Sequence, residues 1–241
     1  MLYSFLGCFA MTTLLAIDCT DQSCSVALCN GDSLYEEFSS EPRRHAQLVL
    51  PMIRQLLETA GLVKRDLDAI AVAKGPGSFT GLRIALSASQ ALGYSLGIPV
   101  IGISSLNALA VGYGRWDVKL AEGDELFVGL DARMGEIYCA CFSMDANGSL
   151  VRDSEDLLLD YEDASKLAGQ CQYGIGTALA LDAFADAEFT HSCANADIHA
   201  ADMCKLALVA YNQSEFIPPL QLEPAYLRRE EAWQKLDQQR V

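Results

Sequence analysis

Basic residues are scarce in this 241-residue chain. It carries 17 Lys and Arg against 32 Asp and Glu, which gives a net charge of −15. Because Lys and Arg contacts to phosphate supply most of the affinity for nucleic acid, so acidic a chain is a poor stand-alone binder of RNA or DNA. The same charge opposes adsorption to an anionic membrane. We therefore expect no membrane contact and no stand-alone binding of nucleic acid.

Histidine is scarce as well, and the cysteines are not spaced as metal ligands. The chain holds three histidines, and the patterns HExxH, HxxxH and CxxC are absent. Zinc sites commonly draw on such spacings, so the sequence marks no metal site. GxSxG is also absent, although catalytic partners distant in sequence stay possible. We predict no metal ligand, no cofactor and no catalytic residue.

Long hydrophobic runs are missing beyond the N-terminus. Residues 1–17 are apolar, but they lack a basic start and reach Asp18 too early for a spanning helix. We interpret Met11 as the functional start, with residues 1–10 as an upstream extension, and we place residues 1–11 outside the fold. The nine cysteines are odd in number and lie in apolar, strand-like segments, as reduced cysteines do. We therefore expect a cytoplasmic protein.

The order of hydrophobic patterns predicts an α/β protein with two lobes. Residues 12–114 read as three strands joined by hairpins, followed by alternating helices and strands, which makes a mixed sheet flanked by helices. A polar, glycine-containing stretch near residue 114 marks the boundary. Residues 115–241 begin again with strands and continue with helical pieces near 162–169, 177–184 and 199–213. We predict a C-terminal lobe with a helical tail.

Two loops have the composition of an anion site. One joins a strand to a helix with the sequence KGPGSFTGLR, and the other, DCTDQS, follows the first strand. Glycines allow close backbone approach, and a helix start presents free N–H groups. No Lys follows the second glycine, so this is not a Walker A loop, and a tight turn capped by Ser78 explains it equally well. The candidate loop residues are Asp18, Thr20, Ser23, Gly75, Gly77 and Ser78.

Two predicted helices are more apolar than one buried face requires. Apolar residues of 46–60 cover an arc of roughly 200°, whereas a helix on one sheet needs about 100°. The helix over 78–97 repeats small residues at Gly81, Ala85, Ser89 and Gly93, a spacing that lets another helix approach closely. We expect an apolar surface that a partner covers, unless the second half of the same chain covers it.

Several motifs resemble those of the bacterial TsaB (YeaZ) family of tRNA threonylcarbamoyladenosine biosynthesis proteins. The motifs are GPGSFTGLR, IPVIGISSL, DARMGEIY and the late PAYLR. The resemblance implies an actin-like (ASKHA) fold of two RNase H-like lobes. It also implies a main partner, the paralogous enzyme TsaD, which transfers threonylcarbamoyl to an adenosine beside the anticodon. The ATPase TsaE would join through the TsaB–TsaD complex, and tRNA contact would be indirect.

The resemblance also implies that this chain lacks the paralogue's metal ligands. Where TsaD carries two histidines, this chain has Ser105 and Leu109, and neither side chain replaces an imidazole at a metal. A noncatalytic scaffold follows, docked on TsaD through its apolar helices. The predicted partner-binding residues are His45, Leu48, Val49, Met52, Leu56, Gly81, Ala85, Ser89 and Leu92.

Two rival functions stay open at this point. The chain is alternatively an active enzyme of this fold, either an ATP-dependent small-molecule kinase or a glycoprotease-like peptidase. The other alternative is a homodimer, because the same helices could pair with each other when the partner is absent. His45 fits a helix-start residue better than a general base.

Overall fold

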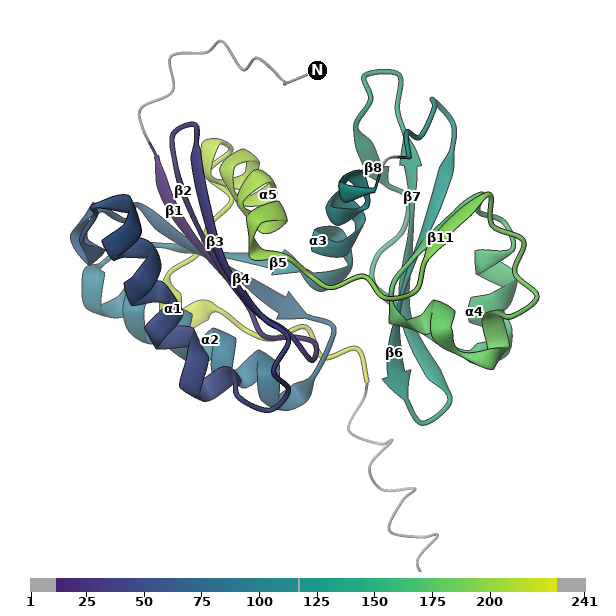
Figure 1. The fold of residues 1–241 in the computed structure, drawn as a ribbon, viewed down its shortest axis with the longest axis horizontal. Helices are drawn as coiled ribbons and strands as arrows, with labels where there is room; N and C mark the ends of the chain where they lie inside the picture. The colour runs from purple at the N-terminus through teal and green to yellow at the C-terminus, as the bar shows by residue number, and fades with distance from the viewer. Residues whose placement is uncertain (1–11, 117, 229–241) are drawn as a thin grey trace, which may run out of the picture.

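Two β-sheets form the framework of the protein (Figure 1). The computed structural model describes residues 12–116 and 118–228, so the predicted extension over residues 1–11 lies outside the described residues. The first sheet has the strand order β3-β2-β1-β4-β5. Its strands are β1 (Thr13–Asp18), β2 (Cys24–Asn30), β3 (Ser33–Ser39), β4 (Ala69–Gly75) and β5 (Val100–Ser104). β1 pairs antiparallel with β2 and parallel with β4, so the predicted mixed sheet is confirmed.

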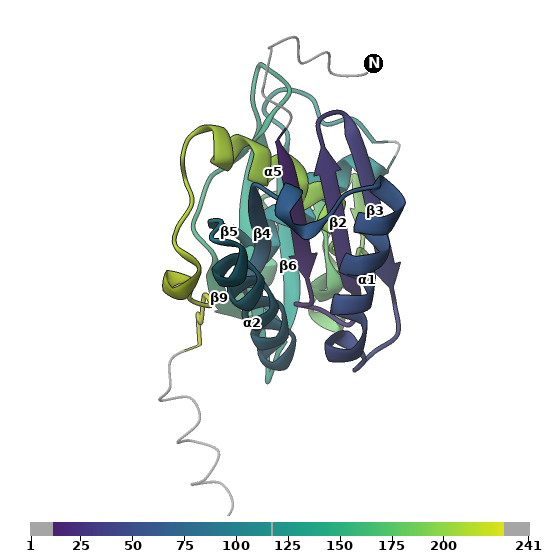
Figure 2. The same ribbon diagram turned by 90° about the vertical axis from the view of Figure 1, so that its left-hand side faces the viewer.

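Helices cover both faces of the first sheet. α1 (His45–Ala60) and α2 (Phe79–Leu96) lie side by side on one face, as Figure 2 shows, and α5 (Ala200–Asn212) packs on the other. Successive residues of β1 explain this arrangement. Leu15 packs with α1 and α2, while Leu14 packs with α5. A strand buried on both faces reads as a continuous apolar run, and TLLAI is such a run.

The second sheet has the order β11-β10-β6-β7-β8, and β9 also pairs with β7. Its strands are β6 (Glu125–Arg133), β7 (Glu136–Met144), β8 (Leu150–Arg152), β9 (Leu157–Asp160), β10 (Tyr173–Ile175) and β11 (His191–Cys193). α4 (Tyr161–Ala168) packs against β7 and β9. The predicted helical piece over 177–184 forms two 3-10 turns, Thr177–Ala180 and Asp182–Phe184.

One apolar core joins the two lobes. α3 (Ser105–Gly112) follows β5 and contacts both α5 and β6. The core continues from Leu14 of the first sheet through Leu109 to Val128 of the second. Figure 1 accordingly shows α5 and α3 between the two sheets. The two RNase H-like lobes predicted from the sequence are therefore present and packed on each other.

The C-terminal part of the chain returns to the first lobe. α5 covers the first sheet, and Ile217 then forms an antiparallel bridge with Val100 at the edge strand β5. Leu222 is only 3% exposed and packs in the core beneath α1 and α2. The boundary placed near residue 114 stays a prediction, but these contacts assign much of the helical tail to the first sheet.

Within residues 12–116 and 118–228, none of the helices combines the length and hydropathy needed to cross a bilayer. The expected cytoplasmic location stays a prediction.

The packing of the C-terminal segment against the first lobe can be tested with two leucines that lie two residues apart. Leu222→Ala should lower the free energy of unfolding by about 3 kcal/mol, because it removes a buried leucine from the first-lobe core. Leu220→Ala is the matched control, since Leu220 is 73% exposed and should lose less than about 0.5 kcal/mol. Urea unfolding of both variants measures this, and equal losses would contradict the assignment.

Candidate functional site

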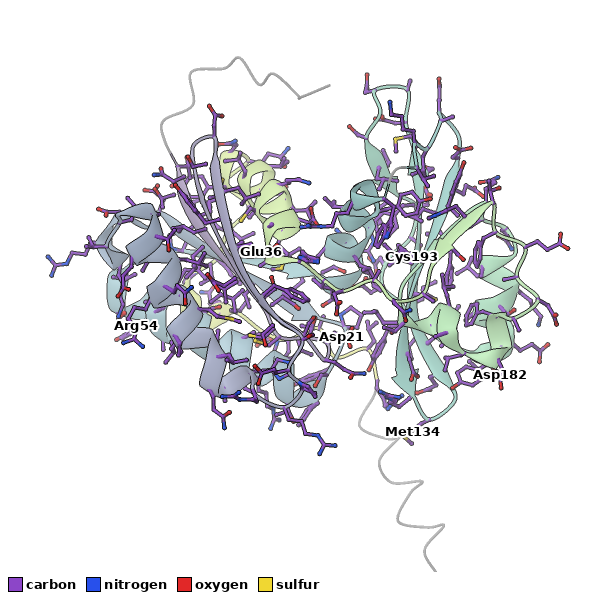
Figure 3. The ribbon with its side chains drawn as sticks, in the orientation of Figure 1. Asp21, Glu36, Arg54, Met134, Asp182 and Cys193 are labelled. Atoms are coloured by element: carbon purple, nitrogen blue, oxygen red, sulfur yellow. The ribbon has the colours of Figure 1, made fainter. Side chains whose placement is uncertain are left out.

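A cleft opens between the two lobes (Figure 3). Its volume is about 1670 Å³. One wall comes from the β1–β2 loop and the start of α2, and the other comes from the β6–β7 turn. Asp21 and Met134, labelled in Figure 3, belong to these two walls. Residues 225–228 also line the cleft.

Asp18 lies beneath the first wall, at the end of β1. Its side chain is fully buried. Thr20 donates two hydrogen bonds to Asp18 Oδ1, from its hydroxyl at 2.6 Å and from its backbone N–H at 3.2 Å. Ser105 Oγ in turn donates to Thr20 Oγ1 at 3.2 Å, while Asp18 Oδ2 has no partner among the described residues. This chain of contacts joins β1 to the start of α3.

Burial raises the pKa of Asp18 to about 7. The two hydrogen bonds from Thr20 favour the carboxylate and oppose this rise, whereas the charges of Asp21 and Asp197 add to it. The Asp18 carboxyl therefore titrates near neutral pH. Perturbed carboxyl groups of this kind occur both at catalytic sites and in buried structural networks.

The two predicted anion loops are packed directly on each other. The backbone N–H of Ser78 donates to the Thr20 carbonyl at 2.7 Å. A Cβ atom on Gly77 would lie 2.5 Å from that same carbonyl oxygen, and a Cβ on Gly81 would lie 1.7 Å from the carbonyl oxygen of Cys19. These glycines are therefore needed because the backbone at the start of α2 touches the β1–β2 loop.

This contact uses N–H groups that an anion would otherwise need. The N–H of Ser78 is bonded to Thr20, and the N–H of Gly81 donates to Ser78 Oγ as an N-terminal cap. Gly75 adopts a φ of 104°, and Ala225 of the returning segment donates its N–H to the neighbouring Lys74 carbonyl. The predicted capped turn accounts for this loop.

Ser23, the remaining predicted loop residue, has a partner through its backbone only, since its hydroxyl has none among the described residues. Ser23 is buried, and its carbonyl accepts a 3.0 Å hydrogen bond from His45 Nε2. His45 begins α1, so this bond ties the helix start to the β1–β2 loop. The interpretation of His45 as a helix-start residue agrees with this geometry.

The two positions at which the resemblance implies histidines in the paralogue, Ser105 and Leu109, do not fit a metal ion. Ser105 is buried and its hydroxyl proton is directed to Thr20. Leu109 is fully buried in the core between the lobes. Among the residues that the structure describes, no group of three or more His, Cys, Asp or Glu side chains is placed to hold a metal.

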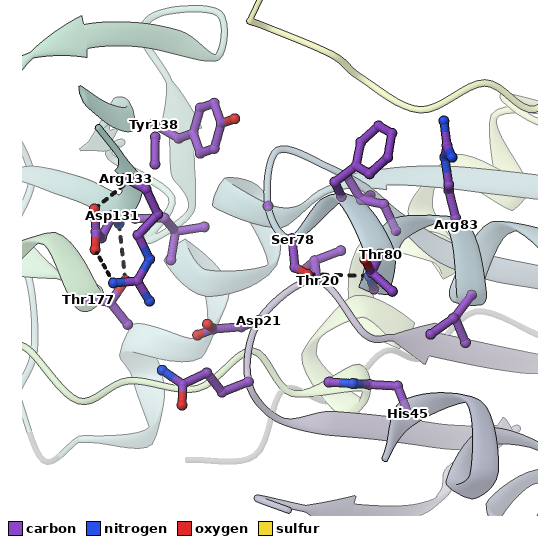
Figure 4. A pocket seen from close by; sticks show the side chains of 18 of the residues that line it. Thr20, Asp21, His45, Ser78, Thr80, Arg83, Asp131, Arg133, Tyr138 and Thr177 are labelled. Carbon is purple, nitrogen blue, oxygen red and sulfur yellow. Dashed lines mark hydrogen bonds and ion pairs between the residues drawn. The ribbon is translucent and has the colours of Figure 1, made fainter. Parts of the chain in front are cut away.

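The second wall of the cleft holds polar residues that the sequence reasoning missed. Figure 4 shows Asp131, Arg133 and Thr177 together on this side. Asp131 forms a 2.9 Å ion pair with Arg133, and its backbone N–H donates to Thr177 Oγ1. Arg228, from PAYLR, donates to the carbonyls of Ala132 and Arg133. Asp131 and Arg133 belong to the motif DARMGEIY and Arg228 to the motif PAYLR. Both motifs were taken above only as evidence of the family resemblance.

Most of the predicted partner-binding residues face inward. The side chains of Val49, Met52, Leu56 and Ala85 are buried in this chain's own core, and His45 and Ser89 are buried as well. Gly81 touches the β1–β2 loop, as described above. The apolar arc of α1 is wide because it reaches both the sheet and α2. Leu48 and Leu92 are half-buried and remain partly at the surface.

A shallow apolar groove lies between α1 and α2, with a volume of about 490 Å³. None of its lining side chains is charged, and several are small. Leu50, one of the lining residues, is 61% exposed. The lining residues are Ala46, Val49, Leu50, Ile84, Ser87, Ala88, Ala91, Leu92 and Ser95. We call this surface the α1–α2 groove.

Comparison with known proteins places the chain in a family. Residues 39–235 match the family model described as TsaD: tRNA N6-adenosine threonylcarbamoyltransferase. The chain is 33% identical to the tRNA threonylcarbamoyladenosine biosynthesis protein TsaB of Escherichia coli (strain K12), over 92% of this chain and 97% of that protein. The chain belongs to the TsaB family. The Haemophilus influenzae TsaB gives the same 33% identity over 93% of this chain.

A solved TsaB-family structure confirms the fold. YeaZ from Pseudomonas aeruginosa superimposes with a TM-score of 0.82 and 33% identity, covering 90% of this chain and all of that one. The resemblance and the fold class expected from the motifs are thereby confirmed. The TsaB-family proteins are named for the biosynthesis of threonylcarbamoyladenosine in tRNA.

The contact between α2 and the β1–β2 loop can be tested with glycine substitutions. Gly81→Ala should lower the free energy of unfolding by about 3 kcal/mol, because the added Cβ would overlap the Cys19 carbonyl. Gly114→Ala is the control, since nothing lies within 4 Å of a Cβ there. Thermal unfolding of both variants reports the difference. A Gly81→Ala variant as stable as the control would contradict the contact.

The buried Asp18 predicts how stability depends on pH. The folded protein binds the proton more tightly than the unfolded chain, so this group's stabilising effect is complete below about pH 4 and is lost as the pH rises toward 7. Asp18→Asn carries no titrating carboxyl, so its stability relative to the unmodified chain should increase across that window by up to about 4 kcal/mol.

Urea unfolding at a series of pH values measures this increase. Asp186→Asn, which removes an exposed carboxyl, is the control for the loss of one carboxylate. If the free energy of unfolding of Asp18→Asn and of Asp186→Asn varied with pH in the same way, the pKa of Asp18 would be the same in the folded and unfolded states. That result would contradict the prediction.

Proposed function

We propose that this chain is a noncatalytic subunit for threonylcarbamoyl transfer to tRNA adenosine, and that it acts by heterodimerising with a TsaD-family paralogue. The observation that carries the proposal is the α1–α2 groove, an uncharged surface on a chain of net charge −15. Exposed apolar grooves on otherwise charged proteins are typical of docking surfaces. TsaE would join through the resulting complex, and tRNA would contact this subunit only indirectly.

The shape of the groove suits an apolar helix of the partner. Small side chains at Ala46, Ala88 and Ala91 line it, and they allow another backbone to approach closely. Leu50 is exposed, so it can enter a hollow on the opposing helix. A paralogue of the same fold would offer the corresponding helix pair, so two pairs would pack together. Two copies of this chain could pair in the same way when the partner is absent.

The cleft chemistry supports a noncatalytic role. Ser105 and Leu109 take part in packing and hydrogen bonding within the chain, and they supply no imidazole. The N–H groups of Ser78 and Gly81 are bonded internally. Both features weaken a site for a metal or a phosphate in this chain, so the transfer chemistry would belong to the paralogue.

A charged side chain placed in the groove tests this proposal. Leu50→Glu or Ala91→Glu should reduce co-purification with a TsaD-family protein by at least tenfold, because the carboxylate would be buried without a partner. Threonylcarbamoyladenosine in tRNA should fall accordingly. Thr59→Glu is the matched control, since Thr59 is exposed on α1 but outside the groove.

Circular dichroism establishes that each variant is folded before the binding assay. Normal tRNA modification with a folded Leu50→Glu variant would contradict the proposed docking surface.

The buried Asp18, with its raised pKa, also fits an active enzyme, either a small-molecule kinase or a peptidase. The purified chain incubated alone with ATP or with peptides distinguishes this alternative. Turnover that is lost in Asp18→Ala would favour it, whereas no turnover without the paralogue agrees with the noncatalytic subunit.

A further inference from the structure

Two cysteines of the second lobe lie in contact at the edge of its outer core. Cys141 belongs to β7, and Cys171 lies between α4 and β10. Their Sγ atoms are 3.6 Å apart. A disulfide needs about 2.05 Å, so the sulfurs must approach by about 1.5 Å. The residues are 30 positions apart in sequence, and the sheet and α4 bring them together.

The two thiols differ in their access to solvent and in their surroundings. Cys171 is 6% exposed and packs with the apolar residues under α4, such as Ala168. Cys141 is half-buried, so a small oxidant can reach it. The hydrogen bond with Cys171 lowers the pKa of Cys141, against the opposing effect of burial. Cys141 is therefore the thiol with more thiolate character and greater exposure.

A second thiol pair in the first lobe provides a built-in comparison. Cys19 and Cys24 have their Sγ atoms 3.7 Å apart, nearly the same separation as Cys141 and Cys171. Both are 0% exposed, and they lie beneath α1, where the Cys24 thiol also contacts Met52 Sδ. Proximity alone would oxidise both pairs, whereas proximity combined with access selects Cys141 and Cys171.

We propose that Cys141 and Cys171 are a reversible oxidation site, which forms an intramolecular disulfide when the protein meets hydrogen peroxide. The Cys141 thiolate attacks one peroxide oxygen, an S–O bond forms, the O–O bond breaks, and the departing hydroxide takes up a proton as water. Cys171 Sγ then attacks the Cys141 sulfenic acid, and a second water leaves. Two thiols and one hydrogen peroxide give one disulfide and two waters.

The cross-link would change the stability of the second lobe. It would tie β7 to the connection between α4 and β10, and it would close a loop of about 30 residues in the unfolded chain. The midpoint of thermal unfolding should rise by about 5 °C in the oxidised protein. Dithiothreitol should reverse this shift. The α1–α2 groove lies on the other lobe, so oxidation should leave docking of a partner unchanged.

Peptide mass spectrometry of the full chain tests the proposal. The folded protein is treated with a few equivalents of hydrogen peroxide, unfolded, and alkylated with iodoacetamide before digestion. The expected result is a linked pair of peptides holding Cys141 and Cys171, with Cys19 and Cys24 alkylated. Cys139→Ser, which changes another cysteine of β7, should retain the link.

Cys171→Ser supplies the second arm of the experiment. It removes the resolving thiol, so Cys141 should accumulate as a sulfenic acid that dimedone traps. The proposal is overturned if Cys19 and Cys24 link first, or if Cys141 oxidises to sulfinic acid while Cys171 remains a free thiol. It is equally overturned if Cys141 stays reduced at doses that oxidise other cysteines of the chain.

Discussion

The contact of the α2 N-terminus with the β1–β2 loop is the constraint on which the rest of the structure depends. Gly77 and Gly81 bring backbone against backbone at Thr20 and Cys19, with no room for a side chain. This contact fixes the start of α2 over the sheet beside α1, which His45 ties to the same loop. The spacing of the two helices, and hence the groove between them, follows from it.

The same contact affects the chemistry of the cleft. The start of a helix presents free N–H groups, which suit it to hold an anion. Here the Ser78 N–H is bonded to Thr20, and Asp18 is buried behind them as a carboxyl with a pKa near neutrality. The lobes and the cleft between them are present, while several groups that would bind a ligand are bonded to one another. The exposed apolar surface lies on the helices instead, and it supports a function through association.

Much of the fold could be predicted from the sequence because its signals are local. Apolar runs such as TLLAI, the hairpins that join the first three strands and the helical spacing of 46–60 each depend on nearby residues, and all three elements are present. The route of the chain after α5 could not be predicted in this way. Its return to the first sheet depends on single contacts, such as Leu222 in the core, that have no periodic pattern.

The candidate site was only partly predictable for a related reason. The two loops were identified, because glycine and small hydroxyl residues cluster in them. What each face of α1 and α2 packs against was not identified, because a wide apolar arc does not distinguish contact with a sheet, a neighbouring helix or a partner. Residues such as Val49 and Ala85 therefore pack within the chain, while Ala46 and Leu50 remain at the surface. The arginines of the second wall come from segments distant in sequence that only folding brings together.

Hydrogen–deuterium exchange of the full chain, alone and with a TsaD-family protein, tests the central claim most directly. The account predicts that added protection falls on the peptides of α1 and α2 that line the groove, while the β6–β7 turn and the second sheet exchange as before. Protection confined to the cleft walls, or no change in α1 and α2 on formation of a complex, would contradict it.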